Sequence, residues 1–515
     1  MQVSTLAAMR VLTARSPAAG DELCAPETLD KIVASLDHPT PAVVVAGCAA
    51  LRALATEGDV DRHASAIVAS GALLPLSQLL HVHDHDVKEA ATRCLAALAA
   101  SGPERAERLV LGPAGGDGSR EAESLLEALC VNAAAEDAPL TLRVAIARFF
   151  EAACAHGEAI TQRVVETDAP ATMARLARVA TGRGLAAGDA TVRARASAFA
   201  CLAQMAKHAD DLAAVVADTG VIRDATAGLM EVGDEGGAAR TEASEASAEA
   251  TREAAAALLR EVASKTPELA ERVAMDGGVA ALVRCLELER GRKRAILATQ
   301  TLGYVADFKP SLAAAATATD GGRCLVDALE VSADSDASIA AAWALGCVAR
   351  HGKESAAPLA KCGAIKALMD CYASVEARDV PALRERAKAA LKHLVKNCGS
   401  LRLLDPLVAP ETPGVILRHV LAEFADKLRG DVELRRAFVT SGGLMRLQAV
   451  LKANDARAAK AAKAREAQTL GAAAETDDQE NDDELEPILD ARAVRDAKKI
   501  NANFPADVVS YYLYC

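Results

Sequence analysis

Apolar residues recur at helical spacing along most of the chain, in stretches separated by short polar turns. Residues 70–80 (SGALLPLSQLL) and 87–100 (VKEAATRCLAALAA) place apolar side chains at intervals typical of a helix with one buried face. The polar residues 81–86 (HVHDHD) lie between them. The pattern therefore predicts two helices joined by a loop.

This pattern returns at a regular interval. Residues 202–222 and 345–365 both contain the end of a long helix, a turn, a second helix, and then a glycine that leads an apolar third helix. The leucine anchors of the clearest copies lie 43, 43 and 46 residues apart, at Leu259, Leu302, Leu345 and Leu391. Looser copies start at Leu51, Leu95, Phe150, Leu391 and Phe424, with a partial one at Leu6. A period of roughly 40–47 residues is typical of armadillo and HEAT repeats.

Glycines distinguish these two repeat types. A glycine precedes the apolar third helix in six copies, at Gly71, Gly220, Gly278, Gly322, Gly363 and Gly443. Glycine permits a sharp change of chain direction, and a glycine-led third helix indicates armadillo repeats. We therefore predict an all-α, armadillo-repeat superhelical solenoid of about nine to ten repeats with a short non-repeat C-terminal tail. A set of unrelated helical hairpins is the weaker alternative, because the order of the helices, the position of the glycine and the period all agree.

Composition shifts suggest the domain boundaries. The solenoid is expected over residues 1–452, with loop insertions at about 112–121 and 231–250. A basic helix followed by an acidic disordered linker is expected over residues 453–486, and a docking or capping segment over 487–515.

The composition suits many small helix–helix contacts. Of 515 residues, 51% are hydrophobic and only 3% are aromatic. The net charge of −13 disfavours nucleic acid and anionic lipid as partners. The 13 cysteines are scattered and suggest no disulfide framework, which fits a reducing compartment. We expect a soluble, intracellular protein, because no apolar run is long enough for a membrane span and no signal-peptide layout is clear.

Candidate chemistry is sparse. The histidines of residues 81–86 could hold a metal, but a solvated loop in which Asp84 or Asp86 caps the next helix is the favoured interpretation. No HExxH, CxxC or GxSxG motif occurs. His208 and His351 occupy the same turn of two repeats, where a histidine can bond a helix C-terminal carbonyl. We therefore predict no metal, no cofactor and no enzymatic activity.

Two sets of residues are candidates for partner binding. Arg223, Lys366 and Arg446 stand three residues after a repeat glycine, where Ala281 and Leu325 occupy the same offset. If that offset faces a groove, these cations can receive an acidic partner segment; ordinary solvated charge is the alternative. The second set, Phe504, Tyr511 and Tyr512, concentrates aromatic side chains near the C-terminus as a cap over the last repeat or a docking segment.

Importin-α-type armadillo proteins bind basic peptides through repeated WxxxN ladders. This chain has one tryptophan, Trp343, and Cys347 stands four residues later in place of asparagine. A receptor for basic peptides is therefore disfavoured, whereas other kinds of groove binding stay open.

Several stretches resemble the sperm-associated antigen 6 family. They are residues 87–100, 260–283, 340–365 and 386–408 in the repeats, and RRAFVTSGGLMRLQAV (435–450) and INANFPADVVSYY (500–512) near the C-terminus. The resemblance covers nearly all the chain, apart from what look like insertions at 112–121, 231–250 and 452–486, and an ending in LYC.

The resemblance implies a structural scaffold of the axonemal central apparatus that binds other axonemal proteins and supports ciliary motility. It implies contact with the central-pair microtubule, directly or through partners, and self-association. The expected location is the cytoplasm and cytoskeleton, at the axoneme of a cilium or flagellum. The alternatives are a soluble armadillo adaptor with a peptide-binding groove and a metal-dependent activity around His81.

Overall fold

The chain is helical wherever its structure is described. The computed structural model describes residues 2–15, 17–112, 118–178, 189–230, 242–288, 293–318, 320–331, 335–374, 377, 379–469 and 488–514. Every regular element in these ranges is a helix, which confirms the all-α fold class. The chain divides into two compact units, unit 1 (residues 1–289) and unit 2 (residues 290–515).

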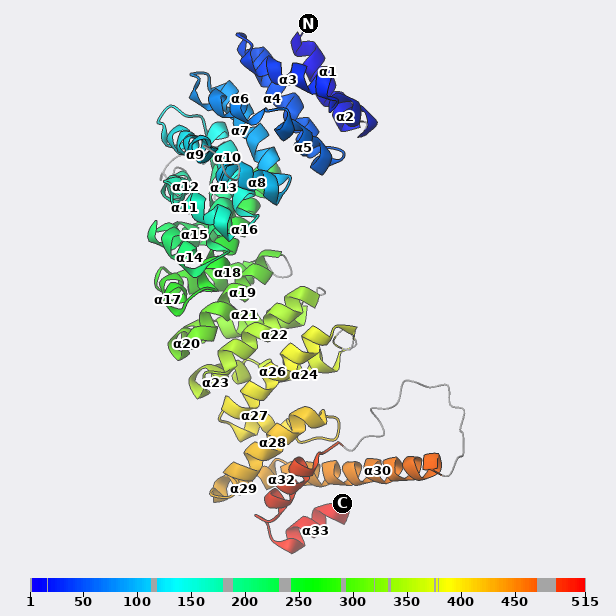
Figure 1. Ribbon diagram of the computed structural model, residues 1–515. Helices are drawn as coiled ribbons and strands as arrows, with labels where there is room; N and C mark the ends of the chain where they lie inside the picture. The colour runs from blue at the N-terminus through cyan, green and yellow to red at the C-terminus, as the bar shows by residue number, and fades with distance from the viewer. Residues whose placement is uncertain are drawn as a thin grey trace. The chain divides into compact units, whose positions relative to one another are not determined.

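Unit 1 repeats a group of three helices: a short helix, a middle helix and a long helix (Figure 1). Its long helices are α1 (Gln2–Arg15), α4 (Pro41–Thr56), α7 (His85–Ala100), α10 (Leu140–Cys154), α13 (Asp189–Ala206) and α16 (Glu242–Ala263). Its short helices are α2 (Pro17–Leu23), α5 (Val60–Ala69), α8 (Pro103–Val110), α11 (Glu158–Val165), α14 (Asp210–Asp218) and α17 (Pro267–Met275). Its middle helices are α3 (Pro26–Ala34), α6 (Leu73–Gln78), α9 (Gly118–Ala134), α12 (Ala169–Arg178), α15 (Val221–Met230) and α18 (Gly278–Leu288), with the 3₁₀ turns η1 (Ser35–Asp37) and η2 (Leu79–His81).

Unit 2 continues the same order. Its long helices are α19 (Lys293–Phe308), α22 (Ser335–Ala349), α26 (Pro381–Asn397), α28 (Gly414–Lys427) and α32 (Ala491–Asn501). Its short helices include α20 (Pro310–Ala318), α23 (Lys353–Lys361) and α29 (Val432–Thr440), and its middle helices include α21 (Gly321–Val331), α24 (Ala364–Ala373) and α30 (Gly443–Thr469). The remaining elements are α27 (Leu401–Leu404), η3 (Asp405–Leu407) and α33 (Ala506–Tyr514).

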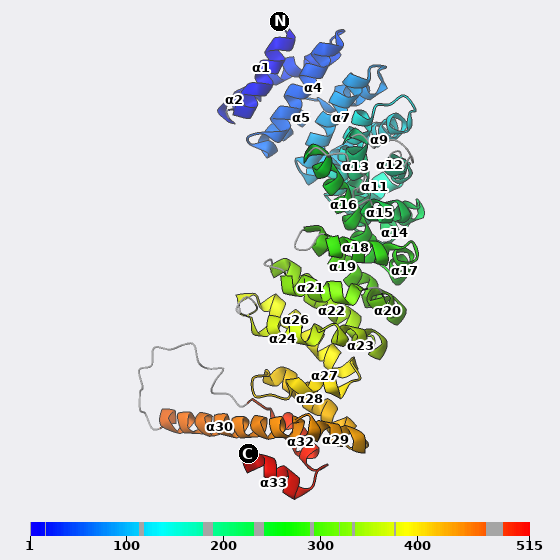
Figure 2. The same cartoon turned by 180° about the vertical axis from the view of Figure 1, so that it is seen from behind.

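The long helices form the continuous stack of each unit. Each packs on the long helix of the next group, from α1 to α16 in unit 1 and from α19 to α32 in unit 2 (Figures 1 and 2). The apolar period explains this packing: in α10, Leu142, Ile146, Phe149 and Phe150 are all fully buried. Among the described residues no single helix is long and apolar enough to cross a membrane, although the bent pair of α5 with the segment Leu73–His81 reaches that threshold by length and composition alone.

Five of the six predicted turns contain a glycine with positive φ, and in two of these five it lies one residue before the predicted glycine. Gly71, Gly220 and Gly363 have φ angles of 78°, 79° and 90°, which only glycine adopts easily. In the pair Gly277–Gly278 the first glycine takes this conformation, with φ 85°, and not the expected second. The second, Gly278, is needed for space, because a Cβ there would lie 2.5 Å from the carbonyl oxygen of Val273.

The same correction applies to the other two predicted glycines. Gly442 has φ 80° ahead of Gly443, and a Cβ at Gly443 would lie 2.3 Å from the Phe438 ring. Before α21 the positive φ belongs to Asp320, at 21°, and Gly322 lies inside the helix. The glycine-led helix is also the middle helix of each group, because the long helix that follows it completes the stack.

Polar contacts tie the ends of several long helices to the turn after the next long helix. His208 Nε2 lies 2.7 Å from the carbonyl oxygen of Cys154, and His351 Nε2 lies 3.0 Å from that of Asp307. These contacts confirm the role expected for the two histidines. Lys265 donates in the same way to the carbonyl oxygen of Lys207. Because these carbonyls end helices, each contact satisfies a group that would otherwise lack a partner.

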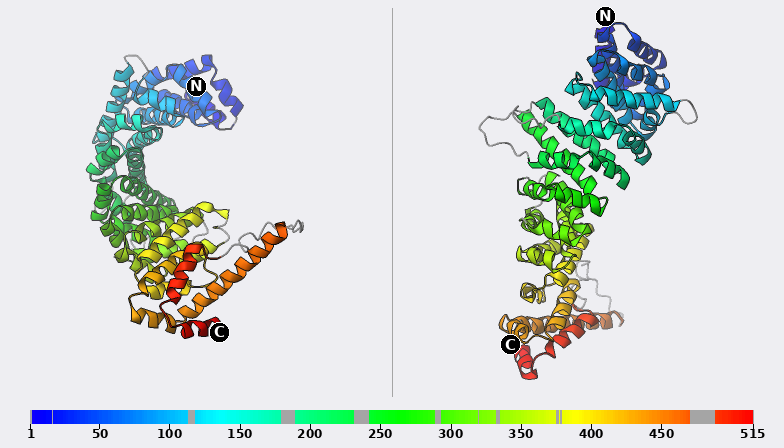
Figure 3. Two further views of the ribbon diagram at one scale, coloured as in Figure 1. Left: turned by 60° about the horizontal axis from the view of Figure 1, so that its bottom comes forward. Right: turned by 90° about the vertical axis from the view of Figure 1, so that its left-hand side faces the viewer.

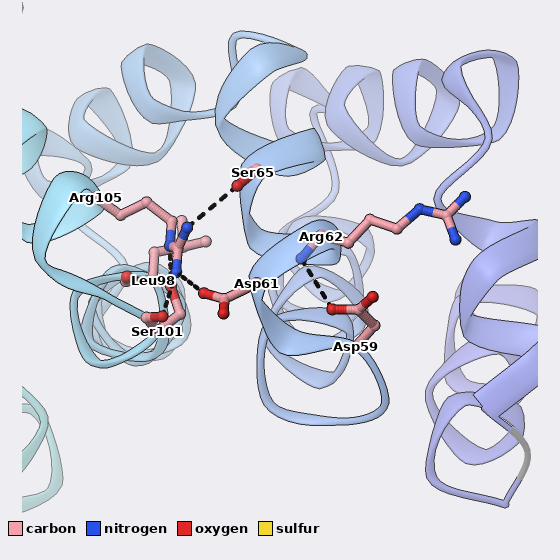
Figure 4. A network of polar contacts seen from close by, with 7 residues as sticks. All are labelled: Asp59, Asp61, Arg62, Ser65, Leu98, Ser101 and Arg105. Carbon is pink, nitrogen blue, oxygen red and sulfur yellow. Dashed lines mark hydrogen bonds and ion pairs between the residues drawn. The ribbon is translucent and has the colours of Figure 1, made fainter.

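Arg105 joins two neighbouring short helices of unit 1 (Figure 4). It lies in α8, and its side chain is only 10% exposed. Its guanidinium donates to Asp61 Oδ1 at 2.5 Å and to Ser65 Oγ at 3.1 Å, both on α5, and to Ser101 Oγ at 2.6 Å. The arginine therefore acts as a clamp between successive groups.

The C-terminal segment completes the last group of unit 2. Helix α32 packs on α28 as the preceding long helices pack on one another, and α33 packs on α30. The structure therefore places a long helix within residues 487–515, which we expected as a non-repeat tail. Helix α30 runs without a break across the expected boundary at residue 452 and extends beyond α28 and α32 (Figure 3).

The expected loops and linker fall largely outside the described residues. Residues 113–117, 231–241 and 470–487 are not described. The described parts of the two expected insertions are helical, because α9 begins at Gly118 and α16 begins at Glu242.

Candidate interaction surfaces

The long-helix stack of unit 1 carries an open hollow at its N-terminal end. It has a volume of about 560 Å³ and lies over α1, α4 and α7. Small side chains such as Ala42, Ala46 and Ala49 leave the space. Its charged rim is mixed, with Arg10, Arg93, Asp84, Asp86 and Glu89, and the pair Glu89–Arg93 is internally neutralised at 2.7 Å.

The long-helix stack of unit 2 carries a different hollow at its C-terminal end. It has a volume of about 780 Å³ and lies between α28 and α32. Its lining residues are Ala422, Ala425, Asp426, Arg429, Arg492, Arg495, Asp496, Lys499, Ala502 and Asn503. Four cations therefore face two carboxylates, in a chain whose net charge is −13.

Positive charge extends from this hollow towards α26. Burial lowers the pKa of His419, and the cations Arg418, Lys392 and Arg492 lower it further. The pKa of His393 on α26 is also lowered, first by burial and then by neighbouring cations that include Lys392. Two histidines on neighbouring long helices thus lie in a positive potential.

The three predicted cations lie on middle helices and do not line either hollow. The Arg223 side chain is 82% exposed and lies 3.3 Å from Asp276, and Lys366 is exposed. Arg446 is partly buried and forms an ion pair with Asp405 at 2.6 Å.

The corrected glycine position changes which residues share the offset. Ala281 and Leu325 are fully buried, whereas Ala280 and Arg323, counted from Gly277 and Asp320, are exposed. Arg323 therefore joins Lys366 as an exposed cation on the neighbouring middle helices α21 and α24. Sequence reasoning missed Arg323 because it counted from Gly322 and not from Asp320, which takes the positive φ.

The predicted aromatic residues at the C-terminus have two different environments. Phe504 is partly buried, and its ring stacks on Phe438 with centroids 6.2 Å apart. Phe438 in turn lies 4.9 Å from Phe424, a buried residue of α28. Tyr511 is 64% exposed and lies edge-on to Tyr512 at 5.2 Å. Phe504 therefore belongs to the last group's core, and Tyr511 faces solvent.

The histidine-rich loop is organised by a helix cap. Asp84 accepts hydrogen bonds from the backbone N–H groups of Asp86 and Val87 at 2.9 and 3.1 Å, which confirms the capping prediction. His85 Nε2 lies 3.2 Å from Asp137 Oδ2. In the part of the chain that the structure describes, no group of three or more histidine, cysteine, aspartate or glutamate residues is arranged to hold a metal ion.

The cysteines and the tryptophan have structural surroundings. Burial raises the pKa of Cys48 and of Cys154 to about 12, so both thiols stay protonated at neutral pH. Trp343 lies edge-on to Tyr304 with centroids 4.8 Å apart, and a Cβ on Gly303 would lie 2.5 Å from its ring.

Groups of short, glycine-led and long helices that stack through their long members define an armadillo-repeat protein. An engineered protein of known structure aligns with 97% of this chain and 94% of its own, with a TM-score of 0.64 and 17% identity. This likeness concerns the fold alone. A designed armadillo repeat protein covers 54% of this chain with a TM-score of 0.44 and 18% identity.

The chain is similar in sequence to sperm-associated antigen 6. It is 35% identical to the Homo sapiens and Mus musculus proteins over 101 residues, which are 20% of this chain. The match spans 19% of the length of these curated relatives. No family model matches the chain. Similarity and fold together indicate a sperm-associated-antigen-6-like armadillo solenoid, a repeat scaffold.

Proposed function

We propose that this chain is a structural scaffold of the axonemal central apparatus in a cilium or flagellum, where it binds other axonemal proteins and supports motility. The observation that carries the proposal is the sequence similarity to sperm-associated antigen 6 on an armadillo-type stack. A stack of long helices offers an extended surface for partner proteins.

The proposed partners are central-apparatus proteins and, directly or through them, the central-pair microtubule. Nonspecific coating of a microtubule is disfavoured, because its acidic surface repels a chain of net charge −13. Contact therefore requires a local cationic surface or an intermediary protein. Self-association through the exposed Tyr511 belongs to the same proposal.

Axoneme fractionation tests this role. The tagged chain is expressed in a ciliated cell, the cilia are extracted with detergent, and the label is located by immuno-electron microscopy. We expect retention in the axoneme with label on the central pair. Release of the chain with the detergent-soluble fraction would contradict the scaffold role and favour an adaptor.

A soluble adaptor with a peptide-binding groove is the second candidate. It is supported by Arg323 and Lys366, which lie exposed on neighbouring middle helices. This function predicts that Lys366→Glu, alone or with Arg446→Glu, abolishes binding of an extended acidic peptide. Unchanged binding in both variants would exclude these cations as the binding site.

A further inference from the structure

We propose that the hollow between α28 and α32 binds an acidic peptide segment of a partner protein. This inference deepens the protein-binding part of the proposed function, because it names the surface and the chemistry of the partner. It rests on geometry, on cations that form no ion pair with another described residue, and on the surrounding potential.

The hollow has the shape for an extended chain. Ala422 and Ala425 on α28 and Ala502 after α32 keep its floor low, while longer side chains stand around them. The hollow has a volume of about 780 Å³ and is open to solvent. A peptide backbone can therefore approach the helices closely, with its own side chains within reach of the rim.

The rim offers cations without carboxylate partners. Lys499 is paired with Asp496 at 2.7 Å. By contrast, no carboxylate of the described residues lies within ion-pair distance of Arg429, Arg492 or Arg495, all of which are exposed. An exposed guanidinium group can take a carboxylate in two parallel hydrogen bonds, and the hollow offers three of them.

The charge pattern favours a peptide over a nucleic acid. Asp426 and Asp496 lie among the arginines and repel a continuous phosphate backbone, whereas a peptide can place neutral residues opposite them. Among the described residues that line the hollow, none has an aromatic side chain on which a base could stack. The hollow of unit 1, with a mixed rim, lacks this excess of positive charge.

Fluorescence anisotropy on the full chain tests the site. The probe is a fluorescein-labelled peptide of alternating glutamate and glycine, and the same peptide with glutamine is the neutral control. We expect saturable binding of the acidic probe that weakens with salt, and roughly a tenfold or greater loss of affinity in the variant Arg429→Gln/Arg492→Gln/Arg495→Gln.

A matched variant separates the site from the overall charge. Lys361→Gln/Lys452→Gln/Lys460→Gln removes the same charge from exposed positions outside α28 and α32, and should change affinity less than about twofold. The charge-conserving variant Arg429→Lys/Arg492→Lys/Arg495→Lys should bind the probe more tightly than the glutamine variant but less tightly than the unchanged chain, because lysine keeps the charge and loses the paired hydrogen bonds.

Three outcomes would overturn the proposal: equal losses in the two glutamine variants, equal binding of the neutral peptide, or tighter binding of single-stranded RNA than of the acidic probe. A chain that is retained in axonemes but does not bind the probe would refute this site and leave the scaffold role in place. A chain that binds the probe but leaves the axoneme with detergent would support this site and refute the scaffold role.

Discussion

Replacing Phe504 by alanine should loosen the C-terminal end of unit 2. The ring of Phe504 stacks on Phe438, which in turn contacts the buried Phe424 of α28. Truncating a fully buried phenylalanine costs about 3–5 kcal/mol. Because Phe504 is only partly buried, we expect roughly half of that value, about 2 kcal/mol, including the lost ring contact.

Hydrogen exchange measured by mass spectrometry localises the effect. A loss of about 2 kcal/mol corresponds to roughly 30-fold faster exchange wherever exchange requires this end to open. We expect that acceleration in α28, α29 and α32, with α19 and α22 nearly unchanged because repeats interact mainly with their neighbours.

Tyr511→Ala is the matched control, because Tyr511 is 64% exposed and its removal should change stability by less than about 0.5 kcal/mol. Exchange that is unchanged by Phe504→Ala, or changed equally by Tyr511→Ala, would refute the capping role of Phe504. Deleting residues 504–515 extends the test: an insoluble product indicates a cap, and a soluble chain that no longer assembles indicates docking.

Two further predictions concern the clamp and the cationic face. Arg105→Met should destabilise unit 1 by about 2–3 kcal/mol in urea unfolding, because four hydrogen bonds at a buried site are lost. Asp61→Asn should cost about 1 kcal/mol or less, because Asp61 is 85% exposed, and equal effects of the two variants would contradict the clamp. The lowered pKa values of His393 and His419 mean that the unfolded chain takes up protons first as pH falls through about 6.5, so the stability of unit 2 present above that pH should decrease on acidification. Unfolding followed by the fluorescence of Trp343 should show a smaller decrease in the variant His393→Gln/His419→Gln, and an unaltered pH dependence would refute the assignment.

The repeat architecture was predictable because local signals agree with packing. Helical apolar spacing, the period, the Asp84 cap and the turn histidines all act over a few residues, and the structure confirms each. The choice between two adjacent glycines was not predictable. Either residue of a glycine pair can take positive φ, and the sequence alone does not say that Gly277 takes it while Gly278 is the residue with no room for a Cβ.

The last helix group and its hollow could not be predicted from the sequence for a different reason. Residues 470–487 separate α30 from α32 in the sequence, so the period breaks and α32 resembles a tail. Arg429 and Arg492 come together only because α32 packs on α28. A search for cations at a fixed offset from glycine therefore found Arg223, Lys366 and Arg446, but not this cluster.

Helix α32 links the C-terminal cap to the proposed binding site. One face of α32 buries Ala493, Ala497 and Ile500, while the same helix supplies Arg492 and Arg495 to the hollow. Suppose that a peptide binds only when α32 is packed on α28. Binding and packing are then coupled, and each stabilises the other by the same free energy. The arginine variants should affect peptide binding alone, because the exposed arginine side chains add little to the packing of α32 on α28. Loss of the cap should thus weaken peptide binding, whereas loss of the arginines should leave the exchange of α28 unchanged in the absence of peptide.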